Sequence, residues 1–218
     1  GRVMTAPNDS VAITPGSGAT IATHLINSKE HQAVVQVDPD GHILGSLPAY
    51  RLTIPPQAVG ASKVLADLWN GGTSRLRILS ARALVNLDTA VTGTLGVRVS
   101  MTRTTAIGTG GTASTYNGTD PTAPTLAPLD ATQTDISATV TARAAPTAGA
   151  TAGAVLATRQ LFTEETNAGS AVAGMLGAEF AGELAPVTIP AGGGLRWVQG
   201  TVASVGSVGI EVVFQVIA

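Results

Sequence analysis

Asp38, Asp40 and His42 are the residues whose types and spacing come nearest to a metal site. Carboxylate oxygens and imidazole nitrogens are ligands that Zn²⁺ accepts. The other two histidines, His24 and His31, lie upstream of this group. However, Asp-Pro-Asp-Gly is a composition that a β-turn prefers, and a turn needs no metal. We therefore expect a turn here and predict no metal and no cofactor.

The sequence lacks the residue patterns that nucleophilic or acid–base catalysis requires. Glu164 and Glu165 are adjacent, so on a strand their side chains point to opposite faces. A glycosidase needs two carboxylates that converge on one bond. The serines of Gly16-Ser17-Gly18 and Gly45-Ser46-Leu47 lack the flanking residues of a nucleophile elbow. We predict that the protein is not an enzyme and has no catalytic residue.

Gly108, Gly110 and Gly111 resemble a phosphate-binding loop only superficially. No Lys-Ser or Lys-Thr follows them, and neither a strand before them nor a helix after them is expected. We interpret them as part of a long exposed loop over Thr104–Ala131, which is rich in Gly, Thr and Pro and has few bulky residues.

The few aromatic residues are the ones that a sugar-binding surface would use. Trp69 and Trp197 lie in strand-like patterns, and because Trp is mostly buried we expect both in the core. Tyr116 lies in the glycine-rich stretch, so we expect it to be exposed; Tyr50 completes the set. One exposed ring is little support for a lectin.

The low content of charged residues indicates that the protein assembles with other subunits. Charged residues make up 12% of the chain, against roughly 25% in an ordinary soluble domain. Lys29 and Lys63 are the only lysines, and the net charge is −2. Soluble monomers usually keep more surface charge, so we infer that part of the surface is covered by other subunits. The alternative is a codon bias of a GC-rich genome.

Several classes of protein are disfavoured by what the chain lacks. It has no cysteine, which excludes disulfides and thiolate chemistry. It has no apolar run of the length that a transmembrane helix needs, and we expect no membrane contact. Its arginines are scattered rather than clustered, so we expect no nucleic-acid binding. The first residues lack the apolar core of an export signal.

Alternation of apolar and polar residues predicts an all-β fold. The clearest strand is Thr94–Arg103, with Leu95, Val97, Val99 and Met101 on the core face. Arg75–Leu79, with apolar residues continuing to Leu87, alternates in the same way. We expect these two strands to pair as an antiparallel hairpin or meander through the turn at Asp88–Gly93.

Further strands are expected along the rest of the chain. The C-terminal one, Val208–Val216, is apolar on both faces towards its end and is therefore expected to be central in its sheet. Helix is expected only as a turn or two within 168–180, whose glycines oppose more. The other expected strands are Thr20–Ile26, His31–Val37, Ala49–Ile54, Ile136–Arg143, Val155–Phe162 and Leu195–Val198.

The N-terminal part of the chain has a less regular residue pattern than the rest. Pro55-Pro56 predicts an extended break. We place the boundary after it, with an N-terminal β-rich arm or small docking segment over 1–60 and an antiparallel β-sandwich body, jelly-roll-like, over 61–218.

Several stretches of the body resemble virion structural proteins of tailed bacteriophages of GC-rich bacteria. The resemblance covers residues 60–218 and rests on texture and order, not on a diagnostic motif. It implies jelly-roll modules used in capsid decoration, fibres or tail attachment, and it carries no catalytic residue. The stretches are Leu68–Ile78, Ala90–Leu95, Thr102–Thr104, Gly108–Thr112, Pro128–Asp130 and Ser204–Gly209.

Residues and resemblance together predict a non-enzymatic structural component of a bacteriophage virion, a capsid decoration or fibre-type protein. Its expected partners are major capsid or tail proteins and further copies of itself, possibly as a trimer. The alternative is a carbohydrate- or receptor-binding β-sandwich module of a phage tail or a bacterial surface. A bacterial adhesin is a third interpretation, which would normally require the missing export signal.

Overall fold

A computed structural model describes residues 23–26, 29–32, 47–86, 92, 95–147, 152–163, 174–175, 177–181 and 187–217. The chain divides into two compact units, residues 1–46 and residues 47–218, which we call the N-terminal unit and the body. The described residues contain sixteen strands and no helix. The predicted all-β class is confirmed.

The N-terminal unit contains a two-stranded antiparallel sheet. Strand β1 (Thr23–Ile26) pairs with β2 (Lys29–Gln32), so that Thr23 lies opposite Gln32 and Ile26 opposite Lys29. Both strands fall within or at the edge of segments in which strands are expected. The turn expected at Asp38–Gly41 lies outside the described residues.

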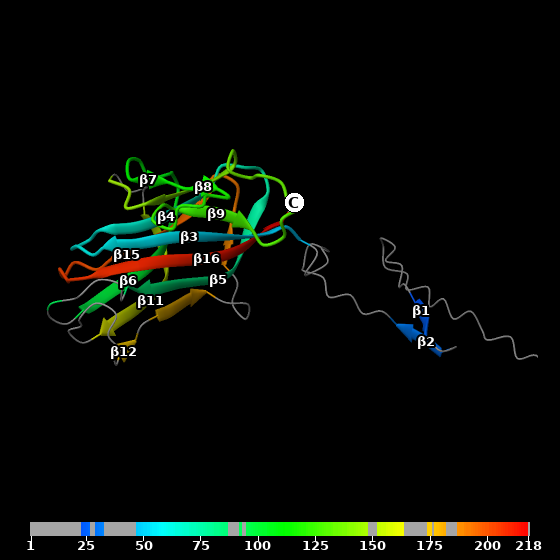
Figure 1. The fold of residues 1–218 in the computed structure, drawn as a ribbon, viewed down its shortest axis with the longest axis horizontal. Helices are drawn as coiled ribbons and strands as arrows, with labels where there is room; N and C mark the ends of the chain where they lie inside the picture. The colour runs from blue at the N-terminus through cyan, green and yellow to red at the C-terminus, as the bar shows by residue number, and fades with distance from the viewer. Residues whose placement is uncertain are drawn as a thin grey trace, which may run out of the picture. The chain divides into compact units, whose positions relative to one another are not determined.

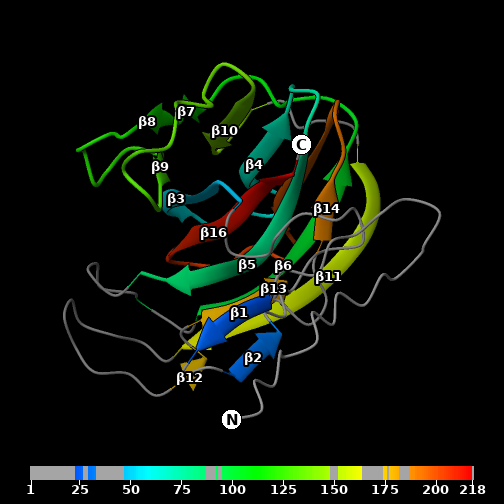
Figure 2. The same ribbon diagram turned by 90° about the vertical axis from the view of Figure 1, so that its right-hand side faces the viewer.

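The body is a β-sandwich of two packed, mostly antiparallel sheets (Figures 1 and 2). We name the first one the β6 sheet. Its strands, in spatial order, are β12 (Gly174–Met175), β11 (Ala152–Thr163), β6 (Leu95–Thr104), β15 (Gly193–Gln199), β4 (Val64–Asn70), β10 (Val140–Ala144) and β7 (Thr112–Ala113).

The second sheet, named the β16 sheet, has β16 between β5 and β3, and these three strands lie side by side in Figure 1. The expected central position of the C-terminal strand is confirmed. In spatial order the strands are β13 (Gly177–Ala181), β5 (Arg75–Val85), β16 (Ser207–Ile217), β3 (Ala49–Ala58), β9 (Thr125–Pro128) and β8 (Thr115–Tyr116), with β14 (Val187–Ile189) also paired to β5.

The core lies between the two sheets, where alternate side chains of each strand meet. Val97, Val99 and Met101 of β6 are fully buried, as the alternation predicts. Each large apolar side chain that is removed from water in this way stabilises the fold by roughly 1.5–3 kcal/mol. Trp197, Tyr50, Phe214, Leu52, Ile54, Leu65, Leu68, Leu76, Ile78, Met101 and Leu126 are the largest side chains of this core.

The hairpin expected between Arg75–Leu79 and Thr94–Arg103 is wrong. Both segments are strands, but β5 belongs to the β16 sheet and β6 to the β6 sheet. Alternation shows which face of a strand is buried, and a strand in either sheet of a sandwich buries one face. The pattern therefore predicts the strands without predicting their partners.

The expected break at Pro55-Pro56 is also wrong, because both prolines lie within β3. The pairing of β3 with β16 shifts register here, between Val208 and Ile210, and the β9 pairing covers only residues 50–53 of β3. Proline is tolerated at an irregularity beside an unpaired edge, since no ladder hydrogen bond is lost. The body therefore begins near residue 47 and not after residue 60.

Three further expectations differ from the structure. Thr104–Ala131 is mostly exposed, but it adds short strands to both sheets, and Leu126 of β9 is buried in the core. The segment expected to hold helical turns contains β12 and β13. The strand expected over Ile136–Arg143 begins only at Val140, after a turn closed by the Thr139 amide and the Ile136 carbonyl.

Candidate functional site

The residues that came nearest to a metal or acid–base site fall outside the described part of the chain. They are Asp38, Asp40, His42, Glu164 and Glu165. For His24 and His31 the structure gives the backbone register, in which they lie opposite each other in β1 and β2. Within the described residues, no group of three or more histidine, aspartate or glutamate side chains is placed to hold a metal ion.

The glycine-rich segment at 108–111 closes over one end of β4 and β10. The Gly108 amide donates to Asp67 Oδ2 at 3.0 Å, and Arg143 Nη1 donates to the Gly110 carbonyl at 3.1 Å. Gly111 has a φ of 64°, and a Cβ there would collide with the Ala144 carbonyl oxygen. Glycine is therefore needed at position 111 for close packing and a left-handed backbone.

Beneath this loop lies Asp67, a carboxylate that is 3% exposed. In the strand register it is opposite Arg143 of β10 on one side and Arg196 of β15 on the other. Burial raises the pKa of Asp67, whereas the Gly108 amide and the Arg143 charge act to lower it. Burial is the larger effect, so the Arg143 charge compensates the buried carboxylate only in part.

Asp67 Oδ1 is buried and makes no hydrogen bond, and the same holds for Thr141 Oγ1 and Arg143 Nε of β10 and for Trp197 Nε1 of β15. A buried, incompletely satisfied polar group costs stability or serves a function. The hydrogen bond from the Gly108 amide to Asp67 Oδ2 fastens the loop to β4. Sequence analysis missed it, although one charge within the apolar run Val64–Trp69 was a visible signal.

The described part of the body has at least two grooves on its surface. One, of about 480 Å³, lies where the connection between β3 and β4 approaches the segment after β10; Ser62, Lys63, Val64, Ala145, Pro146, Thr147 and Arg196 line it. The other, of about 390 Å³, is mainly apolar and lies over the ends of β3 and β5 and the start of β16. Neither groove is lined by an aromatic side chain, which a sugar-stacking site would need.

The aromatic residues have mainly structural positions. Trp197 is fully buried, as expected, whereas Trp69 is only partly buried. Tyr116 was expected to be exposed and is instead partly buried, with its hydroxyl donating to the Gln133 carbonyl at 3.1 Å. The Tyr50 ring stacks on Phe214 with 5.9 Å between ring centroids. The hydroxyls of both tyrosines bond to backbone carbonyls of the connection between β9 and β10.

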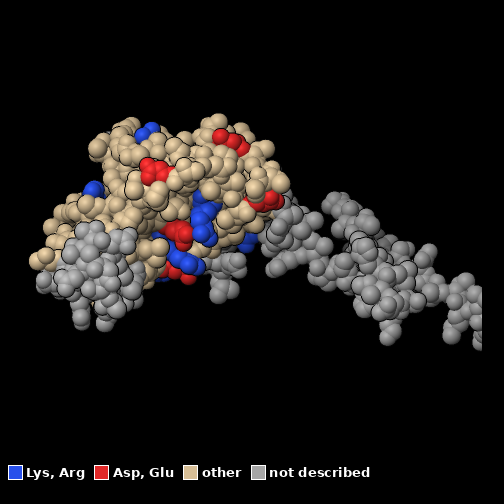
Figure 3. Space-filling view, viewed as in Figure 1, with Lys and Arg blue, Asp and Glu red and all other residues tan. Residues whose placement is uncertain are grey.

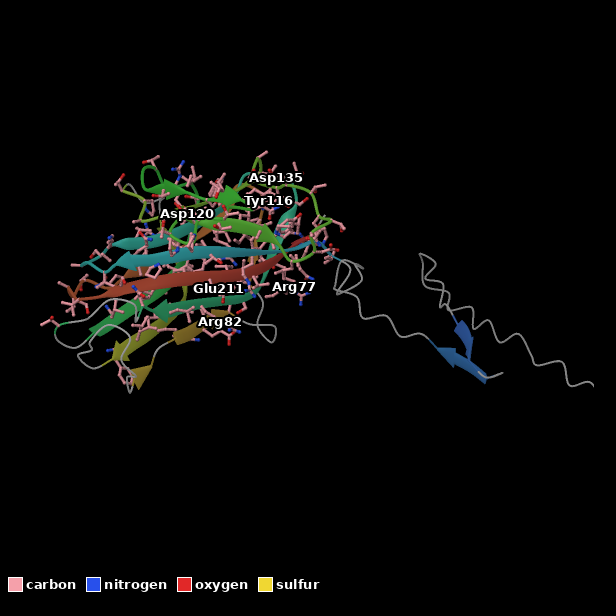
Figure 4. All side chains as sticks on the ribbon, in the orientation of Figure 1. Arg77, Arg82, Tyr116, Asp120, Asp135 and Glu211 are labelled. Atoms are coloured by element: carbon pink, nitrogen blue, oxygen red, sulfur yellow. The ribbon has the colours of Figure 1, made fainter. Side chains whose placement is uncertain are left out.

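Charged side chains are sparse on the face seen in Figure 3 and gather in a few places. On the outer face of the β16 sheet, Glu211 lies opposite Arg82, and Arg82 lies opposite Glu179 (Figure 4). Arg51 Nη1 is 3.3 Å from Glu211 Oε1. We call Arg51, Glu211, Arg82 and Glu179 the charge row. Such exposed pairs add little stability, but alternating signs can set the register of a partner.

The described surface also carries large apolar side chains that no neighbour covers. These are Leu84 (45% exposed), Leu129 (53%), Val155 (62%), Phe162 (50%), Val202 (75%) and Val205 (43%). Single exposed apolar residues are ordinary on proteins. Here they occur on a chain with few charges, so they are the surface feature that most needs explaining.

Comparison with protein-family models, with curated proteins and with solved structures found no match to this chain. The part of the chain that the structure describes contains no helix of the length and apolar character needed to cross a membrane.

Proposed function

We propose that the protein is a non-enzymatic structural component of a bacteriophage virion, a capsid decoration or fibre-type protein held by protein–protein contacts. The observation that carries the proposal is the exposure of six large apolar side chains on a body with few charges. Partners that cover such side chains gain roughly 25 cal/mol for each Å² of apolar surface removed from water. The virion assignment itself rests on the resemblance in residues 60–218.

The buried polar chemistry of the body fits a structural role. Asp67, the most deeply buried carboxylate among the described residues, fastens a loop by accepting from the Gly108 amide. The three described aspartates outside the sheets fix turns: Asp120 Oδ1 accepts from the Thr122 amide at 2.8 Å, Asp130 Oδ1 from the Thr132 amide at 2.9 Å, and Asp135 Oδ1 from the Ser137 amide at 2.7 Å. These carboxylates stabilise loops, which a coat or fibre protein needs in order to present a defined surface.

The proposed partners are other virion proteins, namely the major capsid or tail proteins, and further copies of the chain. The charge row places charges of alternating sign on one face of the β16 sheet, and the exposed apolar side chains provide apolar surface that a partner can cover. Apolar area and placed charges are the two kinds of surface that interfaces combine.

A second candidate is a carbohydrate- or receptor-binding module, which the groove at Lys63 and Arg196 favours. Two cationic side chains and the hydroxyls of Ser62 and Thr147 line it, and such groups bind acidic sugars. A glycan array with the full chain tests this candidate: binding that Arg196→Ala abolishes would support it, and a blank array would remove it.

The main proposal is tested on phage particles. Antibody against the chain, applied to purified particles and viewed by electron microscopy, should label the shell or a fibre at many positions. Mass spectrometry of the same particles should find the chain at a copy number that matches the symmetry of that location. Particles that lack the chain would overturn the proposal.

A further inference from the structure

The chain contains two Asn-Gly pairs, Asn70-Gly71 and Asn117-Gly118, and the structure places them in opposite environments. Asparagine is a thermolabile residue, because the backbone nitrogen of the next residue can attack its side-chain amide carbon within the same chain. Glycine as that next residue leaves the approach open, since it has no Cβ. On residue types alone the two pairs are equally reactive, so their surroundings decide between them.

Asn70, at the end of β4, is buried and held by hydrogen bonds. It is 1% exposed, and its Nδ2 donates to the Ser74 carbonyl at 2.7 Å and to the Pro190 carbonyl at 3.0 Å. The nitrogen that would attack it is engaged as well, because the Gly71 amide donates to the Thr139 carbonyl at 2.7 Å. Reaction at Asn70 must therefore wait until this part of the fold opens and these bonds break.

Asn117 is exposed and directly follows β8, which lies at one end of the β16 sheet. Within the described residues, neither its side-chain amide nor the Gly118 backbone amide makes a hydrogen bond. The Asn117 backbone has a φ of 50°, a left-handed conformation that asparagine adopts more readily than most residues. The attacking nitrogen and the leaving amide are therefore both available, and water reaches them.

Little structure must open for the reaction at Asn117. Strand β8 has only two residues, Thr115 and Tyr116 (the latter labelled in Figure 4), and it pairs only with β9. After β8, the Asn117 amide donates to the Leu126 carbonyl at 2.9 Å. A short segment at the edge of a sheet opens at a lower free energy than the core strands do. The Gly118 nitrogen can therefore reach the Asn117 side chain while the body stays folded.

We propose that Asn117 is a deamidation site of the folded protein and that Asn70 is not. The Gly118 nitrogen attacks Asn117 Cγ and forms a C–N bond that closes a succinimide ring. The Cγ–Nδ2 bond breaks, and Nδ2 leaves as ammonia with the proton of the Gly118 amide. Water then opens the ring. Opening at Cγ leaves aspartate, whereas opening at the main-chain carbonyl carbon leaves isoaspartate, in which the main chain runs through Cβ and Cγ. Water is the only co-reactant.

Both products change the charge at this edge of the β16 sheet, and isoaspartate also changes the backbone. Each adds one negative charge to a chain whose net charge is −2. Gly118 packs so closely on Thr115 that a Cβ there would collide with Thr115 Oγ1, and the longer main chain of isoaspartate displaces this contact. The reaction depends on local structure alone, so this inference goes beyond the proposed function and does not rest on it.

Peptide mapping of the full chain by mass spectrometry tests the proposal. Cleavage after lysine and arginine leaves each asparagine alone in its peptide, residues 64–75 for Asn70 and residues 104–143 for Asn117. In mildly alkaline buffer the folded chain should deamidate at Asn117 at least about tenfold faster than at Asn70, because Asn70 must first be opened. In denaturant the two rates should converge. Equal rates in the folded chain, or reaction at Asn117 only after denaturation, would refute the proposal.

Isoelectric focusing of the undigested chain gives a second readout. The parent chain should develop a more acidic band with time. Asn117→Gly removes the reactive amide and keeps a residue that adopts a positive φ, so this variant should fold as the parent does and should not develop the band. A thermal melt beside the parent checks its fold. An acidic band that forms equally fast in Asn117→Gly would place the reaction at another residue and overturn the assignment.

Discussion

The hydroxyl of Tyr50 donates a 2.9 Å hydrogen bond to the carbonyl oxygen of Thr134, which lies 84 residues further along the chain. The adjacent Ala49 amide donates to Gln133 Oε1 at 3.1 Å, and Tyr116 reaches the Gln133 carbonyl. The connection between β9 and β10 is thus fastened to the start of β3 by side chains that are distant in sequence.

Replacing Tyr50 with Phe should lower the free energy of unfolding by about 1 kcal/mol, because it removes one hydrogen bond but keeps the ring on Phe214. Tyr116→Phe is the matched comparison and should cost less, since Tyr116 is only partly buried. Urea denaturation measures both. An equal or larger loss in Tyr116→Phe would show that Tyr50 is not the main fastening point.

The same tyrosine should make stability depend on alkaline pH. Burial, first among the causes, raises the pKa of Tyr50 above its ordinary value of 10.0. As the pH rises, the unfolded state therefore loses the Tyr50 proton before the folded state does. The contribution of this group to the free energy of unfolding is fully present below pH 10.0 and is lost as the pH rises through the folded-state pKa. Thermal melts across that range should show a steeper loss in the parent chain than in Tyr50→Phe.

Asp67→Asn should change the pH dependence of stability on the acid side. Because burial raises the pKa of Asp67 above 3.8, the unfolded state releases this proton first as the pH rises. The contribution of protonated Asp67 to the free energy of unfolding is fully present below pH 3.8 and is lost as the pH rises through the folded-state pKa. The asparagine variant keeps an acceptor for the Gly108 amide without this loss.

The measurement is the difference in free energy of unfolding between Asp67→Asn and the parent chain, from about pH 3 to about pH 7. We expect the difference to move in favour of the variant as the pH rises. Movement in favour of the parent would mean that the arginines Arg143 and Arg196 compensate the carboxylate by more than its burial costs.

The two faces of β6 should respond very differently to substitution. Val97 is 1% exposed, so Val97→Asp should cost several kcal/mol or unfold the chain, because the new charge has no partner. Arg98 is exposed, and Arg98→Ala should change stability by less than about 0.5 kcal/mol. Thermal melts of both variants beside the parent check this. A large loss at Arg98 would show that this face is covered by another chain.

Truncation tests the position of the domain boundary. A chain that starts at Leu47 should fold, because it keeps all of β3. A chain that starts at Ala61 should fail to fold, since it lacks Tyr50, Leu52 and Ile54 and exposes both β16 and β9 along their sides. Circular dichroism with a cooperative melt distinguishes the two. A folded chain from Ala61 would restore the boundary expected after residue 60.

The longer strands follow from the sequence alone, whereas the short strands β7, β8, β9, β12 and β13 do not. Period-two alternation in β6 and β16, and the turn residues before β15, predict where strands run and which side chains are buried, because a strand exposes alternate residues to alternate faces. The sequence likewise indicates one central strand, since the C-terminal segment is apolar on both faces near its end.

Only the tertiary structure decides which strands pair and what lies at the surface. β5 and β6 are neighbours in sequence but belong to opposite sheets, and Asp67, Arg143 and Arg196 form one row although 129 residues separate the first from the last. Alternation is a local property, whereas pairing depends on total burial across the sandwich.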